Sequence, residues 1–99
     1  MKHYTFNKEN WTGEEATICV KDNCFEFNGY SFELEARTYT YDFDGQSITD
    51  FVVHSDDWPA PIFTVKSDCE GGYYCENNGI ERQGKNPFIL AAQMAANTI

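Results

Sequence analysis

Apolar and polar side chains alternate along much of the chain, and this period of two is typical of β-strands. Residues 2–7 and 24–27 alternate over short stretches, and residues 30–41 do so over the longest one. In the longest stretch, one side of the predicted strand carries Tyr30, Phe32, Leu34 and Ala36, and the other carries Ser31, Glu33, Glu35 and Arg37. Residues 46–53 are predicted to return beside it as a further strand.

Residues 15–20 allow two interpretations. The stretch Glu-Ala-Thr-Ile-Cys-Val is rich in β-branched side chains, which favour a strand. Thr12 followed by Glu15, however, matches a capping box, which would start a short helix near Gly13. We expect a strand, with the helix as the alternative.

Two turns are predicted to join the alternating stretches as hairpins. Asn28-Gly29 supplies the two positive-φ residues of a type I′ turn, and Asp44-Gly45 repeats the signal. A two-residue turn at Asp44-Gly45 would place Tyr41 opposite Ile48 and Tyr39 opposite Asp50. In that register the candidate core face holds Leu34, Ala36, Phe51 and Val53. The opposite face holds Glu33, Glu35, Tyr39, Tyr41, Ile48 and Asp50.

The C-terminal part is predicted to contain a loop, short strands and one helix. Two prolines favour a loop over 54–61, residues 62–66 predict a strand, and turns at 71–72 and 77–79 flank a short Tyr-Tyr-Cys segment. Asn86 can cap a helix whose first residue is Pro87 and which continues through Ala96. The apolar stripe of this helix consists of Phe88, Ala91, Ala92, Ala95 and Ile99.

These elements predict an α+β fold, an antiparallel β-sheet meander with a single C-terminal α-helix packed on one face. The 99 residues are 41% hydrophobic and 16% aromatic, which is enough for one core. Two cores of half that size would each need disulfides or metals, so we expect a single domain over residues 1–99. The longest apolar run, from Phe88 to Ala92, is far too short to span a membrane.

Four cysteines raise the question of zinc, disulfides or free thiols. Cys19 and Cys24 are separated by four residues, and Cys69 and Cys75 by five, unlike the two-residue gaps of a zinc ribbon. The N-terminus has no apolar segment typical of a secretory signal, so we expect a cytoplasmic protein whose structural cysteines are reduced. A secreted domain with two disulfides is the alternative.

Patterns that would support catalysis or ligand binding are weak. Residues 42–47 resemble part of a calcium loop, but the twelfth position holds Val53 where such a loop needs Glu. Glu33 and Glu35 lie about 7 Å apart along a strand, which suits a glycosidase pair, yet the chain has little room for a cleft. His54 and Ser55 are adjacent in sequence, and adjacent side chains usually diverge. We predict no enzyme, no cofactor and no metal.

Charge is distributed unevenly. The chain carries 16 acidic and 7 basic residues, a net charge of −9, and residues 9–57 alone contain twelve acids and two bases. This excess disfavours nucleic acid as a direct ligand, because such binding depends on Lys and Arg meeting phosphates. Acidic residues interleaved with aromatic ones are instead suited to the basic surface of a nucleic-acid-binding protein. The alternative is that the charge serves solubility alone.

Two short segments resemble a known family. Residues 56–62 (Asp-Asp-Trp-Pro-Ala-Pro-Ile) and 86–92 (Asn-Pro-Phe-Ile-Leu-Ala-Ala) are similar to the C-terminal half of small NinX-type phage proteins. The likeness covers about 45 of the 99 residues. The small, acidic and aromatic chain also resembles, by type, phage inhibitors of the anti-CRISPR kind. Both resemblances imply a phage protein acting in the cytoplasm of a bacterial host.

The sequence therefore predicts a phage-encoded inhibitor that binds a basic, nucleic-acid-handling host complex by charge mimicry. The predicted charge contacts are Glu33, Glu35, Asp42, Asp44 and Asp50, and the predicted aromatic anchors are Tyr39 and Tyr41. Two alternatives remain open at this point. One is a small phage structural protein that self-associates through its sheet edge or aromatic face, for example as a homodimer. The other is the disulfide-containing secreted domain.

Overall fold

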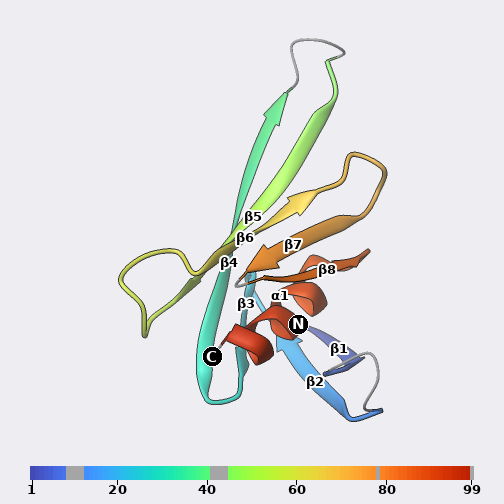
Figure 1. The fold of residues 1–99 in the computed structure, drawn as a ribbon. Helices are drawn as coiled ribbons and strands as arrows, with labels where there is room; N and C mark the ends of the chain where they lie inside the picture. The colour runs from blue at the N-terminus through green and yellow to red at the C-terminus, as the bar shows by residue number, and fades with distance from the viewer. Residues whose placement is uncertain (9–12, 41–44, 78, 99) are drawn as a thin grey trace.

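A computed structural model describes residues 1–8, 13–40, 45–77 and 79–98. In order along the described chain, the elements are β1 (Lys2–Asn7), β2 (Glu15–Val20), β3 (Cys24–Phe27), β4 (Tyr30–Thr40), β5 (Ser47–Ser55), β6 (Phe63–Ser67), β7 (Tyr73–Asn77), β8 (Ile80–Gly84) and α1 (Pro87–Thr98). β1 and β2 form an antiparallel pair, and β3 to β8 form an antiparallel sheet in sequence order (Figure 1). The predicted α+β meander with one C-terminal helix is confirmed.

The hairpin between β3 and β4 turns at Asn28-Gly29, as predicted. Asn28 has φ 53° and Gly29 has φ 81°, and Phe27 lies opposite Tyr30 across the turn. A type I′ turn needs both central residues at positive φ, which Asn and Gly tolerate better than other residues. This short turn fixes the register of β3 against β4.

The predicted register of β4 against β5 is wrong by two residues. Tyr39 lies opposite Ile48 rather than Asp50, and the last pair is Thr40 with Ser47. A shift of two keeps every side chain on its original face, so hydrophobic alternation supports both registers equally. Leu34 and Val53 therefore still share the core face, as predicted. The predicted turn at Asp44-Gly45 lies partly outside the described residues.

The expected strand over residues 15–20 is confirmed as β2, so the helix alternative near Gly13 is wrong. Two other elements differ from the sequence prediction. β5 continues to Ser55, which places His54 and Ser55 in a strand instead of the predicted loop. β8 was not predicted, because its sequence Ile-Glu-Arg-Gln-Gly contains a single large apolar residue and lies at a sheet edge.

Helix α1 covers one face of the sheet, which we call the inner face. Asn86 caps the helix, since its Oδ1 accepts hydrogen bonds from the backbone N–H of Phe88 (2.9 Å) and Ile89 (3.2 Å). The buried helix residues are Leu90, Ala91, Ala92, Met94 and Ala95. They share one hydrophobic cluster with β1, β2 and the inner face, which includes Phe6, Ile18, Phe27, Phe32, Leu34, Val53 and Val65. Two members of the predicted stripe differ: Phe88 is half-buried, and Ile99 lies outside the described residues.

The far ends of β4 and β5 extend beyond this core as a two-stranded arm, formed by residues 36–40 and 47–50 (Figure 1). The prediction that Ala36 belongs to the core is therefore wrong, because Ala36 is exposed at the base of the arm. Phe51, also predicted to be core, is half-buried and packs against Phe88 of the helix at a ring-centroid distance of 6.0 Å. The projecting arm gives the molecule its longest extent of 42 Å.

Candidate functional site

The predicted site residues that the structure describes lie on the face of β4 and β5 opposite the helix. This outer face carries Glu33, Glu35, Arg37 and Tyr39 from β4, and Ile48, Asp50, Val52 and His54 from β5. The cluster that α1 joins contains Phe32, Leu34 and Val53, which point to the other side. Glu33 and Tyr39 are consequently exposed, with 43% of Tyr39 accessible to solvent.

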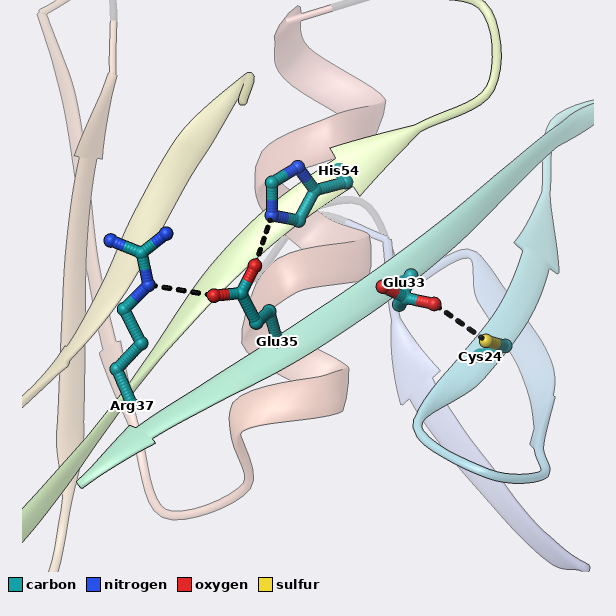
Figure 2. Close-up of polar contacts among 5 residues, drawn as sticks. All are labelled: Cys24, Glu33, Glu35, Arg37 and His54. Carbon is teal, nitrogen blue, oxygen red and sulfur yellow. Dashed lines mark hydrogen bonds and ion pairs between the residues drawn. The ribbon is translucent and has the colours of Figure 1, made fainter. Parts of the chain in front are cut away.

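Glu35 is the centre of a small polar network on the outer face (Figure 2). Its Oε2 accepts a hydrogen bond from Nε of Arg37 at 2.8 Å, and its Oε1 lies 3.0 Å from Nε2 of His54. The hydrogen bond from Arg37 is the main reason that the pKa of Glu35 lies below its ordinary value, and His54 contributes in the same direction. Glu35 is thus already paired, which makes it a weaker candidate for a partner contact than the sequence predicted.

Asp50 also has partners within the fold. Its Oδ2 accepts a hydrogen bond from the hydroxyl of Tyr39 at 2.8 Å, and its Oδ1 accepts one from the backbone N–H of Ser67 at 2.9 Å. The β5–β6 register runs from Phe51 to Val53, so the bond to Ser67 attaches the end of β6 to β5 beyond the paired residues. Asp50 therefore joins strands and orients Tyr39. The remaining predicted residues, Tyr41, Asp42 and Asp44, lie outside the described residues, and their roles stay predictions.

At the other end of the outer face, Glu33 lies in a groove of about 940 Å³. The groove is lined by β2, β3, β4 and the end of β5, and its lining includes Cys19, Cys24, Glu26, Glu33, His54, Asp56 and Trp58. Sequence reasoning selected only Glu33 from this set. The one available signal was the turn at Asn28-Gly29, because a two-residue turn there implies the register that places Cys24 opposite Glu33.

Three carboxylates, against the single lysine Lys21, give the lining of the groove an excess of negative charge. The thiol of Cys24 donates to Oε2 of Glu33 at 3.8 Å (Figure 2). Burial raises the pKa of this thiol above its ordinary value, and the charges of Glu33, Asp22 and Asp56 raise it further. A reactive cysteine needs the opposite environment, in which nearby positive charge favours the thiolate. Cys24 is accordingly placed as a neutral hydrogen-bond donor among carboxylates rather than as a nucleophile.

Trp58 provides an aromatic wall of the groove. Its ring lies against Tyr30 with centroids 5.4 Å apart, and its backbone N–H donates to the carbonyl of Ser55 at 3.1 Å. The side chain is nevertheless 38% exposed. A fixed, partly exposed indole next to carboxylates can contact a cation through its ring face.

The cysteines differ in their environments, and all four are free thiols in the structure. Cys75 is buried, Cys24 and Cys69 are exposed, and Cys19 lies 3.3 Å from Nε2 of His3. The expectation of buried structural thiols therefore fits Cys75 alone, since the others lie in strands or turns at the surface. Among the described residues, no three His, Cys, Asp or Glu side chains gather closely enough to hold a metal ion.

Comparison with protein-family models, with curated proteins and with solved structures finds no match. In the part of the chain that the structure describes, no helix has the length and apolar character needed to cross a membrane.

Proposed function

We propose that the protein is an acidic inhibitor that binds a basic, nucleic-acid-handling host protein or complex and blocks its nucleic-acid-binding surface. The observation that carries this proposal is the groove at the end of the outer face, which α1 does not cover. Glu26, Glu33 and Asp56 line this groove together with the partly exposed ring of Trp58. Carboxylates at such a place can meet the Lys and Arg side chains that otherwise hold phosphates.

The contacts that support binding are not the full set predicted from the sequence. Glu35 and Asp50 accept short hydrogen bonds from partners within the fold. Glu33 accepts one from the thiol of Cys24, which is a weak donor. We therefore assign the main charge contacts to Glu26, Glu33 and Asp56, with Trp58 as the aromatic anchor. Aromatic residues that are rigid and partly exposed commonly dominate the energetics of protein interfaces.

The proposal includes a phage origin and action in the cytoplasm of a bacterial host. It is supported by the resemblance of residues 56–62 and 86–92 to NinX-type phage proteins, and by the likeness in type to anti-CRISPR inhibitors. Trp58 belongs to the first of these segments, which forms part of the groove wall.

The test is affinity purification from a bacterial lysate with three forms of the protein. The groove variant carries Glu26→Lys, Glu33→Lys and Asp56→Lys. The matched control carries Glu70→Lys, Glu76→Lys and Glu81→Lys, which change the net charge equally at exposed positions away from the groove. We expect the wild type and the control to capture a nucleic-acid-binding protein that the groove variant does not.

The captured protein is then tested for binding to its own nucleic acid. We expect the wild type to compete with that nucleic acid. Equal capture by all three forms would contradict the assignment of the groove, and a captured protein that still binds its nucleic acid would contradict inhibition by charge mimicry.

A further inference from the structure

Where the arm projects from the sheet, one edge of β4 has no neighbour among the strands that the structure describes (Figure 1). β3 pairs with β4 over Tyr30 to Glu33, and the last backbone bond on that side runs from the N–H of Leu34 to the carbonyl of Asn23 at 2.9 Å. From Ala36 to Thr40, none of the described strands lies beside β4 on this side. The residues of this stretch, 36–40, are exposed.

The alternation of a strand identifies the backbone groups at this open edge. Because the N–H of Leu34 points toward the β3 side, the N–H and C=O groups of Ala36, Thr38 and Thr40 point the same way, and those of Arg37 and Tyr39 point toward β5. A row of outward backbone donors and acceptors is a template for another strand. The edge offers three such residues, at every second position from Ala36 to Thr40.

Between Ala36 and Thr40 the β4 edge lacks three features that often protect sheet edges from association. These are proline, lysine, and a charged residue that points inward; the charge of Arg37 lies on the outer face instead. The opposite edge strand, β8, has one of them, because Arg82 lies opposite the buried Cys75 and shares its inward direction. On β4 the side chains of the arm that lie on the inner face are those of Ala36, Thr38 and Thr40, which are uncharged. Threonine and tyrosine in this stretch favour strand pairing.

We infer that this edge pairs with the same edge of a second copy of the chain, antiparallel and centred on Thr38. Thr38 then lies opposite Thr38 of the second copy, and Ala36 lies opposite Thr40. The edge-facing backbone groups of all three residues are thereby paired. Arg37 lies opposite Tyr39 of the second copy on the outer face, where a guanidinium can lie over an aromatic ring.

Neighbouring registers are less favourable. Centring the pair on Arg37 places two like charges directly opposite each other and leaves Thr40 unpaired. Centring it on Ala36 would need the N–H of Leu34, which already donates to Asn23. Within the described residues 36–40, the register centred on Thr38 is the one that pairs all three edge residues, and its complementary chemistry favours a second copy as the occupant.

This dimer has a consequence for the groove. Antiparallel pairing in one sheet keeps the faces of the two strands on the same sides, so both outer faces and both grooves lie on one side of the shared sheet. The self-association itself does not depend on the proposed inhibitor function. Where both hold, the dimer presents two binding grooves to a partner and gains affinity from double attachment.

The first test is the mass in solution, measured by sedimentation over a range of concentrations. Thr38→Pro removes an edge N–H without touching the ladder to β5, and proline is tolerated at sheet edges. Thr38→Val is the matched control, because it loses the hydroxyl contact with Thr49 (2.8 Å) but keeps the N–H. We expect dimers of the wild type and Thr38→Val, and monomers of Thr38→Pro with an unchanged circular dichroism spectrum.

The second test needs no variant and covers the case in which Thr38→Pro does not fold. Amide hydrogen exchange of the wild type is followed at low and high protein concentration. We expect protection of the amides of Ala36, Thr38 and Thr40 to rise with concentration, while the amides of Arg37 and Tyr39 stay unchanged. A wild type that is monomeric throughout, or exchange at these three amides that is independent of concentration, overturns the inference.

Discussion

At the scale of single residues, Cys75 shows how burial alone changes chemistry. Its side chain is 1% exposed within the cluster that joins α1 to the sheet, and burial raises the pKa of its thiol to about 11 from an ordinary 9.0. The folded protein thus holds the thiol proton more tightly than the unfolded chain does. The resulting stability is fully present below pH 9 and is lost as the pH rises toward 11.

We predict that the wild type loses about 2 kcal/mol of unfolding free energy through this group between pH 9 and pH 11. Urea denaturation at several pH values measures the loss. Cys75→Ala should lack this part of the pH dependence, while Cys69→Ala, at an exposed position, should keep it. Identical pH profiles for the wild type and Cys75→Ala would show that the thiol is not responsible.

Glu35 shows the opposite direction of shift at the surface. Because its pKa is lowered, its contribution to stability is present above the ordinary value of 4.5 and is lost as the pH falls through the folded pKa. We predict that Arg37→Gln raises the pKa of Glu35 toward 4.5, and that His54→Gln raises it less, since the bond from Arg37 is the largest cause. Carboxyl carbon NMR titration measures both. An unchanged titration in Arg37→Gln would disprove the role of the guanidinium.

At the scale of elements, the first turn of α1 is held by Asn86. We predict that Asn86→Ala lowers the unfolding free energy by about 1 kcal/mol, because two backbone N–H groups lose their acceptor. Asn86→Asp keeps an acceptor oxygen and adds a favourable charge at the helix N-terminus, so it should be close to wild type. Thermal unfolding of the three proteins measures the difference. A loss of the same size in Asn86→Asp would mean that the cap is not the cause.

The elements differ in how far the sequence could predict them. Asn28-Gly29 and Asn86-Pro87 determine local geometry directly, and the structure has the predicted turn and helix start at both places. The register of β4 against β5 depends on where the connection ends, and registers that differ by two residues bury the same side chains. β8 has little hydrophobic signal of its own, because it pairs at an edge with β7.

At the scale of the whole molecule, the site depends on which face the helix covers. Alternation predicted that Glu33, Glu35, Tyr39 and Asp50 share one face, and the structure places that face outside. It could not predict that Glu35 meets His54, because His54 was expected in a loop. Nor could it predict that Asp50 meets the backbone of Ser67, because the sequence does not indicate how β5 and β6 pair. The groove was missed for the same reason, since it brings residues of β2 and β3 next to Trp58.

The central claim is that the acidic groove binds a basic partner by exposed charges. The most direct measurement is the affinity of the captured partner for the wild type and for the groove variant as the salt concentration rises. Exposed charges are screened within about 8 Å at physiological ionic strength. We predict that wild-type affinity falls steeply with salt and that the Glu26→Lys, Glu33→Lys, Asp56→Lys variant binds weakly at every concentration. An affinity that is the same for both proteins and indifferent to salt would contradict the claim.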